Sequence, residues 1–228
     1  MWIEEFWRYP VKSMAGEQLA HARLTPLGID GDRVVQVHNA AGQTVTARTY
    51  PGLLQFRATL DARRRVLVDG RPWADPEVLR AVRAVVGPGS QLVQDERIDR
   101  FDILPLLVAT DGAIAAFGRD RRRLRPNIVV GGVDGLTERE WQGGRLFVGE
   151  VEIAIDDLRG RCVMTTFDPD TGVHDPNVLR DIVKRFGGKL ALNCAVAKGG
   201  EIHVKQEVRF VSAQAVPPAN CVRYPPKP

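Results

Sequence analysis

The chain has 228 residues, of which 44% are hydrophobic, and its 32 Lys and Arg against 28 Asp and Glu give a net charge of +4. This is the composition of a globular protein, and it contains no apolar run long enough to cross a bilayer. The basic residues do not alternate with aromatic ones as in a stacking platform for nucleic acid. The sequence therefore predicts neither a membrane nor a nucleic-acid partner.

The N-terminus and the cysteines indicate a compartment. Residues 1–5 carry two acids and no basic region, which predicts no signal peptide. The cysteines, Cys162, Cys194 and Cys221, are odd in number and widely spaced, so they supply no disulfide framework, zinc knuckle or iron–sulfur set within one chain. We therefore expect a reducing, cytoplasmic location.

Short β-like segments dominate the sequence. Pro10 ends the first of them, a four-residue turn predicts a hairpin between the third and the fourth, and Asp69-Gly70 predicts a tight turn. The expected strands are residues 2–9, 18–24, 34–38, 44–47, 56–60, 66–68, 127–130, 145–148, 151–155, 163–166, 190–196, 201–204 and 207–211.

Three short helices interrupt the strands. Asp75 as N-cap, Pro76 as first helical residue and Gly87 as terminator predict a helix over 76–86. A second helix is expected over 111–117. A third is expected over 176–186, with an apolar face and a glycine stop. The expected apolar face of the third helix comprises Val178, Leu179, Ile182, Val183 and Phe186.

The order of these elements predicts the fold class. Strands outnumber helices and do not alternate with them, which argues against a doubly wound sheet and for a mainly β (α+β) barrel or sandwich with a few short helices. Charge rises and the apolar pattern lapses between Gln94 and Phe101. We expect a β-rich N-terminal region over 1–95, a second domain over 96–212 and an extended or disordered proline-rich tail over 213–228.

Two turns in the N-terminal region place polar residues after or before a strand. Lys12 and Ser13 lie between Pro10 and Gly16, where free backbone NH groups suit an anion, although this segment alone favours a plain surface turn with a solvated lysine. Arg33 lies at the start of the strand over 34–38. It either reaches a phosphate or pairs with a neighbouring aspartate, Asp30 or Asp32.

Two later segments add cations and a thiol. Arg125 and Asn127 flank Pro126 at a strand entrance, at the end of a basic run over 119–125 that otherwise suits a solvated loop. Cys162 follows Arg159 and Arg161, and nearby cations favour the thiolate, which ligates soft metals or attacks electrophiles. The alternative is a small buried hydrophobic residue, which suits Cys194 well. The four histidines have no zinc-ligand spacing.

In order, these segments resemble the MOSC family, whose name comes from the C-terminal domain of molybdenum cofactor sulfurases. The motifs are Tyr-Pro-Val-Lys-Ser, Gly-Ile-Asp-Gly-Asp-Arg, Arg-Pro-Asn-Ile-Val-Val and Arg-Cys-(x2)-Thr-Thr-Phe-Asp-Pro-Asp-Thr-Gly. Each motif is weak alone, but four collinear motifs spanning about residues 2–211 are strong evidence. The chain is most similar to the mitochondrial amidoxime reducing component and bacterial N-hydroxylated-base reductases.

The resemblance implies a MOSC-type β-barrel packed on the β-rich N-terminal region, and a bound molybdenum cofactor. Carried over by position, Cys162 is the metal ligand and the catalytic residue. Thr110 stands near the place where family members often have a serine, whereas Ala113 offers no hydroxyl. The residues that would contact the pterin and its phosphate are Lys12, Ser13, Arg33, Thr110, Arg125, Asn127, Gly160 and Arg161.

The resemblance also implies an activity, which is reduction of small-molecule N-hydroxylated (N–O) substrates by a molybdenum-dependent oxidoreductase. The chain has no cysteine set for a ferredoxin domain, so its electrons would come from a separate donor protein. Asp168 or Asp170 would assist proton delivery or merely shape a turn. The alternatives are a non-catalytic carrier of the cofactor or of sulfur, and a structural domain whose motifs are relics.

Overall fold

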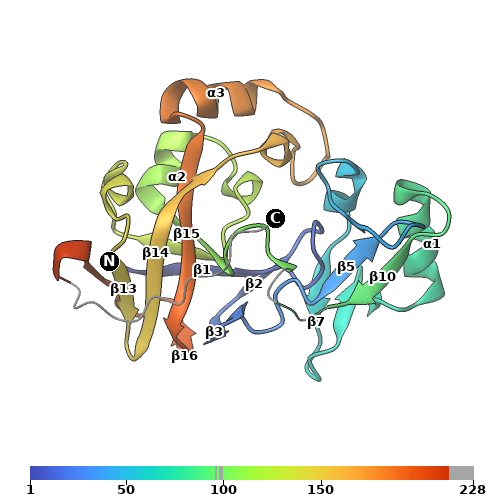
Figure 1. Ribbon diagram of the computed structural model, residues 1–228, viewed down its shortest axis with the longest axis horizontal. Coiled ribbons are helices and arrows are strands. Elements are labelled where there is room, and N and C mark those ends of the chain that lie inside the picture. The colour runs from blue at the N-terminus through green and yellow to red at the C-terminus, as the bar shows by residue number, and fades with distance from the viewer. Residues whose placement is uncertain (96, 98–99, 216–228) are drawn as a thin grey trace.

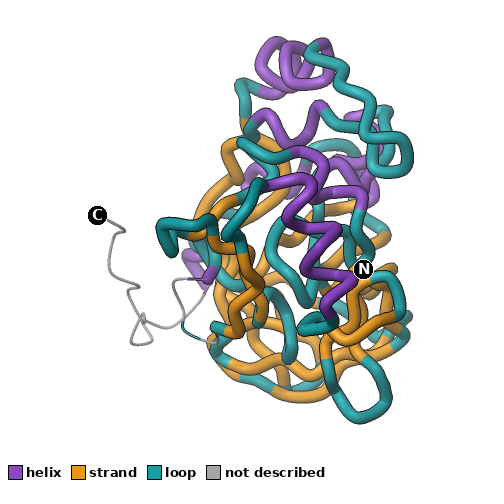
Figure 2. The backbone as a smooth tube through the Cα atoms, turned by 90° about the vertical axis from the view of Figure 1, so that its right-hand side faces the viewer, coloured by secondary structure: helices purple, strands orange, loops and turns teal. Residues whose placement is uncertain are grey.

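The computed structural model describes residues 1–95, 97 and 100–215 and shows a mainly β protein with three α-helices in that part. In Figure 1 the long strands β14 and β15 stand beneath helices α2 and α3, with β16 and β3 below them, while β5, β7, β10 and α1 lie on the other side of the molecule. Figure 2 shows most of the strands in the lower part of the molecule, with helices α2 and α3 above them. Most of the predicted tail, residues 216–228, lies outside the described residues.

The largest sheet has eight strands in the order β17-β13-β14-β15-β11-β12-β1-β2. All neighbours are antiparallel except β11 and β12, which run parallel. The end strands β17 and β2 do not pair with each other among the described residues, so the sheet curves without closing into the barrel that the resemblance implied. Its strands are β1 (Trp2–Arg8), β2 (Glu17–Leu19), β11 (Leu106–Thr110), β12 (Ile128–Gly131), β13 (Arg145–Val148), β14 (Val151–Gly160), β15 (Lys189–Lys198) and β17 (Arg209–Val211).

Three small sheets complete the β structure. The predicted strand over 18–24 splits at Ala20 into β2 and β3, which belong to different sheets. The predicted hairpin forms between β5 and β6, and a strand that the sequence did not predict, β10, pairs with β5. The small sheets contain β3 (His21–Thr25), β4 (Gly28–Ile29) and β16 (Gly200–His203); β5 (Val35–His38), β6 (Thr44–Val45) and β10 (Gln91–Gln94); and β7 (Ala58–Leu60), β8 (Val66–Val68) and β9 (Arg71–Pro72).

The three predicted helices are confirmed as α1 (Pro76–Val86), α2 (Asp111–Phe117) and α3 (Asn177–Phe186). The carboxylate of Asp75 caps α1 by accepting from the backbone NH of Glu77 at 2.7 Å. Gly118 ends α2 with φ of 67°, a left-handed conformation that glycine adopts without a steric penalty. Short 3-10 helices occur as η1 (Pro51–Gln55), η3 (Arg121–Arg123), η4 (Thr137–Glu140), η5 (Val163–Thr166) and η6 (Ala213–Ala215).

The strand predicted over 163–166 is wrong, because these residues form the 3-10 helix η5. The hydroxyl of Thr165 donates to the carbonyl of Cys162 at 2.9 Å, and that of Thr166 donates to the carbonyl of Val163. Threonine hydroxyls that bond to nearby carbonyls offer the backbone an alternative to a sheet ladder. The chain therefore turns directly after Cys162.

Three apolar clusters fill the interior. One lies on the large sheet, a second lies within the N-terminal region, and a third lies under α2 and α3. The third cluster includes Leu124, which is fully buried and immediately precedes Arg125. Met164 and Phe167, from the segment after Cys162, pack against the N-terminal cluster. Packing therefore holds the segments around Arg125 and Cys162 at the junction of the two halves.

No helix in the described part of the chain is long and apolar enough to span a membrane.

Helix α3 buries a narrower face than its sequence predicts. Val178, Ile182 and Phe186 are buried against α2, whereas Val183 keeps 57% of its surface exposed. Val183 lies one residue after Ile182 and thus about 100° around the helix. The prediction that Val183 belongs to the buried face is wrong.

We expect Ile182→Ala to lower the free energy of unfolding by about 2–5 kcal/mol, because it leaves a cavity in a packed core. Val183→Ala is the matched control and should change this free energy by no more than about 0.5 kcal/mol. Urea unfolding followed by circular dichroism measures both. Equal losses for the two variants would show that α3 does not pack as described.

Candidate functional site

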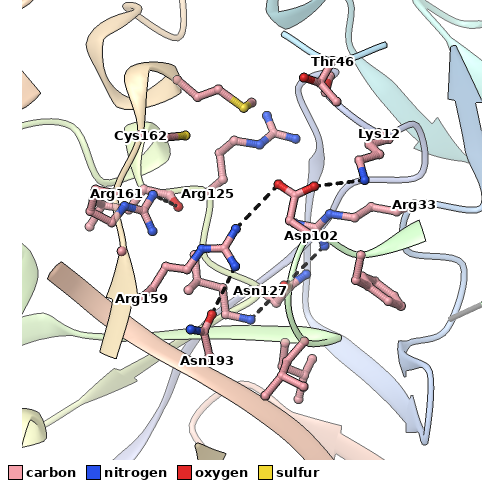
Figure 3. A pocket seen from close by; sticks show the side chains of 18 of the residues that line it. Lys12, Arg33, Thr46, Asp102, Arg125, Asn127, Arg159, Arg161, Cys162 and Asn193 are labelled. Carbon is pink, nitrogen blue, oxygen red and sulfur yellow. Dashed lines mark hydrogen bonds and ion pairs between the residues drawn. The ribbon is translucent and has the colours of Figure 1, made fainter. Parts of the chain in front are cut away.

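A cleft lies at the junction of the two halves and encloses about 80 Å³. Figure 3 shows Cys162 and Arg161 on one side of it, Lys12 and Arg33 on the other, and the Asp102 carboxylate between them. All but one of the predicted site residues line it: Lys12, Ser13, Arg33, Arg125, Asn127, Gly160, Arg161 and Cys162.

The elements that present these residues are turns at strand ends. Lys12 and Ser13 follow β1, Arg33 precedes β5, and Arg125 lies between η3 and β12. Ser13, Arg33 and Arg125 have φ of 72°, 54° and 56°, a left-handed conformation that costs residues other than glycine free energy. Three such residues around one cleft show that the surrounding structure imposes their backbone conformation.

Asp102 joins the cations of the cleft. Its carboxylate lies 3.0 Å from the ammonium of Lys12, 2.8 Å from the guanidinium of Arg48 and 3.6 Å from that of Arg159. Burial alone raises the pKa of Asp102, but the three cations outweigh it and bring the pKa down to about 2. Asp102 is therefore ionised at neutral pH and holds residues from both halves together.

Asp32 and Asn127 form a second anchor. The fully buried Asp32 carboxylate accepts from the backbone NH of Tyr9 at 2.7 Å and from the Asn127 amide at 3.2 Å, and it pairs with Arg33. The Asn127 oxygen accepts from the backbone NH of Leu107 at 3.1 Å. Both ends of the Asn127 amide are thus bonded within the protein. Of the two partners predicted for Arg33, the structure selects Asp32.

Arg125 is held beneath the cleft by stacking and one hydrogen bond. Its guanidinium lies 4.2 Å from the centre of the Tyr9 ring and donates to the carbonyl of Met14 at 2.7 Å. Burial lowers the pKa of Arg125 to about 10, so the group stays charged at neutral pH.

Arg161 keeps two hydrogen-bond donors without a partner among the described residues. One of its nitrogens donates to the carbonyl of Leu124 at 2.7 Å, but Nε and Nη1 are buried and have no hydrogen-bond partner in the described part of the chain. Burial first, and then the charge of Arg159, lowers the pKa of Arg161 to about 10. A buried charged donor without a partner is costly, so this side chain suits an anionic ligand in the cleft.

Cys162 is a free, partly exposed cysteine at the start of η5. Asp102 and, to a lesser extent, Cys162 raise the pKa of Arg48, and a contact between the Arg48 side chain and the thiol adds to this. Just before Cys162 in the chain, the β14–β15 pairing shifts register between Leu158 and Gly160. This shift turns Arg159 toward the cleft. Cys194 instead lies buried on β15, where burial raises the pKa of its thiol.

Thr110 does not line the cleft. Its hydroxyl caps α2 by accepting from the backbone NH of Ala113 at 3.1 Å, and it donates to the buried Glu138 at 3.3 Å. Asp168 and Asp170 also lie outside the lining. Asp168 accepts from the backbone NH groups of Asp170 and Thr171 at 3.1 and 2.9 Å, so it shapes the turn, as one of the two predicted roles has it.

Several lining residues were not predicted. Asn193 on β15 accepts from Arg159 at 3.2 Å and donates to Asp157 at 2.7 Å. Asp102 and Thr46 lie outside every motif, and no sequence pattern signals them. In the described chain no group of three or more His, Cys, Asp or Glu residues could hold a metal ion.

The site is a cleft that combines one free thiol with several arginines at the junction of two β-rich halves. Residues 1–86 match the family described as MOSC N-terminal beta barrel domain, and residues 113–209 match the MOSC domain. The chain belongs to the MOSC family.

Curated relatives and a solved structure agree with this assignment. The human mitochondrial amidoxime reducing component 2 is 28% identical over 81% of this chain and 72% of the relative. The human mitochondrial amidoxime-reducing component 1 is 25% identical over 75% of this chain and 67% of the relative. The YUAD protein from Bacillus subtilis shares the fold with a TM-score of 0.51 at 14% identity, over 92% of this chain and 98% of that one.

We expect Asp102→Asn to reduce stability in a pH-dependent way. Because its pKa is about 2 in the folded protein against an ordinary 3.8, ionised Asp102 stabilises the fold above about pH 4, and this contribution is lost as pH falls through 2. The variant should lose about 2 kcal/mol of unfolding free energy at pH 6, and the loss should shrink toward pH 2.

Urea unfolding between pH 2 and 6 measures this difference. Asp134→Asn is the control, since Asp134 is exposed and its carboxylate has no ion-pair partner among the described residues. A destabilisation by Asp102→Asn that does not vary with pH would mean that the ion pairs contribute nothing.

Proposed function

We propose that this protein binds a molybdenum cofactor and reduces N-hydroxylated (N–O) compounds. The observation that carries the proposal is the pair of buried donors on Arg161 that have no partner among the described residues, next to the Cys162 thiol in a cationic cleft. A site that keeps cationic donors free near one thiol suits a ligand that combines an anionic group with a soft metal. The names of the relatives support the choice of substrate, because they are amidoxime reducing components.

The residues of the cleft fit the parts of such a cofactor. Its phosphate is a dianion, and Lys12, Arg33 and Arg161 supply cationic donors for it. A thiolate from Cys162 is the soft ligand that suits molybdenum. At Gly160 an added Cβ would meet no atom within 4 Å, so the backbone there borders open space rather than packed side chains.

The remaining predicted contacts are Ser13, Arg125 and Asn127. The Ser13 hydroxyl accepts from the backbone NH of Ala47 at 3.0 Å, which leaves its own proton for a ligand. Arg125 supplies charge from beneath the cleft, and Asn127 fixes Arg33 and the strand entrances. Thr110 is left out of the proposed contacts, because its hydroxyl is bonded to Ala113 and Glu138.

When bound, the cofactor supplies the two-electron chemistry that takes oxygen from nitrogen. In the overall reaction the N–O bond breaks, two electrons and two protons are consumed, and the oxygen leaves as water. The chain contributes the binding and orientation: Cys162 fixes the metal, and Arg161 and Lys12 hold the anionic end, with Asp102 keeping Lys12 in place.

The electrons come, in this proposal, from a separate donor protein, which fits relatives that are named as amidoxime reducing components. A reducing cytoplasm suits a protein whose function depends on a free thiol. We also propose the division into an N-terminal region over 1–95 and a MOSC domain over 96–212, which the two family matches support.

We expect Cys162→Ala to lose most of the molybdenum that the wild type retains after production with cofactor supply, because the variant lacks the thiolate ligand. Elemental analysis and pterin fluorescence measure the cofactor. Reduction of benzamidoxime by dye-reduced protein measures the activity. Cys194→Ala is the control, since Cys194 lies in the core away from the cleft, and it should keep the metal.

The outcomes separate the alternatives. Equal molybdenum in wild type and Cys162→Ala would refute the ligand assignment. Loss of metal in the variant, combined with a wild type that reduces no N–O compound, would favour a carrier of the cofactor or of sulfur. A wild type that binds neither molybdenum nor pterin would favour a structural domain.

A further inference from the structure

A second cavity adjoins the cleft and encloses about 400 Å³. The two share Arg123, Arg125 and Met164 as a common wall. This volume lies within the range of roughly 300–1,000 Å³ that small-molecule pockets occupy. The cleft at Cys162 is the smaller of the two, and ion pairs cross it.

The walls of the second cavity are largely aromatic and aliphatic. Tyr9 and Trp7 come from the segment around β1, Leu54 from η1, and Phe167 from the turn after η5. The Tyr9 ring is already stacked on Arg125, and Phe167 is stacked on His174 at 4.9 Å between ring centres. Fixed rings of this kind accept a planar, apolar ligand at low conformational cost.

Arginines outnumber carboxylates among the residues that line this cavity. Four arginines line it, against one carboxylate, Asp170. Arg122 pairs with Asp170 at 2.6 Å, and Arg123 pairs with Asp168 at 2.9 Å. The exposed Arg57, in contrast, has no side-chain hydrogen bond or ion pair within the part of the chain that the structure describes. It is therefore a guanidinium available to an anionic substituent.

We propose that the second cavity is the substrate chamber, and that it selects planar aromatic N-hydroxylated compounds that carry a carboxylate. The ring lies against Phe167 and Leu54, the carboxylate pairs with Arg57, and the N–O group points to the wall shared with the Cys162 cleft. This assignment rests on the proposed function for the reaction, but the binding it describes does not require turnover.

The pterin of the cofactor is the competing occupant. A pterin needs partners for its ring amides, and the amide side chain in this wall is Gln55. In the orientation that satisfies both of its ends, Gln55 donates to the carbonyl of Asp170 at 3.1 Å and accepts from the backbone NH of Gly172 at 3.2 Å. The wall therefore offers ring faces and guanidinium groups, which suit an aromatic acid better.

The test compares benzamidoxime with 4-carboxybenzamidoxime. Calorimetric titration into cofactor-free protein measures the binding of each, and kcat/KM of the cofactor-loaded protein measures selectivity. We expect the wild type to bind the carboxylate compound roughly fivefold more tightly than the neutral one, and Arg57→Gln to abolish this ratio, as for a partly exposed ion pair. Arg63→Gln removes an exposed arginine that lines neither cavity, and it should keep the wild-type ratio.

Phe167→Leu provides an independent variant, since it keeps an apolar side chain but removes the ring, and it should weaken binding of both compounds about equally. A wild type without preference for the carboxylate compound, or a preference that Arg57→Gln leaves unchanged, overturns the assignment. Loss of molybdenum in cofactor-loaded Arg57→Gln would assign the cavity to the pterin and overturn it as well. Arg57-dependent binding without any turnover upholds the chamber and refutes the proposed reductase.

Discussion

The concentration of positive charge at one junction is the constraint on which the rest of the structure depends. Two unit charges about 4 Å apart repel by roughly 4 kcal/mol at an effective dielectric constant of about 20. Lys12, Arg48 and Arg159 would be subject to such repulsion without the Asp102 carboxylate. The Asp32 carboxylate likewise compensates the charge of Arg33. Two carboxylates thus make a cationic cleft compatible with a stable fold.

The same two carboxylates connect the halves of the molecule. Lys12 and Arg48 belong to the N-terminal half and Arg159 to β14, and all three meet at Asp102. Through Asn127, Asp32 connects the turn before β5 with the entrance of β12. An anion bound in the cleft would therefore interact with groups from both halves at once, which links ligand affinity to the way in which the halves pack.

Local signals in the sequence predicted local features well. Asp75, Pro76 and Gly87 determine α1 through contacts within a few residues, and the turn motifs led to eight of the residues that line the cleft. The residues that were missed act over long range. Asp102 lies 90 positions from Lys12, and its importance arises only when the chain is folded. The strand predicted over 163–166 failed because threonine hydroxyls bond to local carbonyls, a contact that hydrophobic pattern does not reveal.

The structure also separates site residues that the motifs treat alike. Asn127 and Arg161 both line the cleft, but the Asn127 amide is bonded at both ends, whereas Arg161 keeps two buried donors without a partner in the described chain. A bonded side chain gains little from a ligand, while an unpartnered buried cation recovers the cost of its desolvation when an anion arrives. In the proposed complex, Arg161 would therefore gain most from an anion, whereas Asn127 joins the surrounding strand entrances through its hydrogen bonds. The motifs bring these residues to one cleft, but the hydrogen bonds formed in the folded protein determine which of them remain available to a ligand.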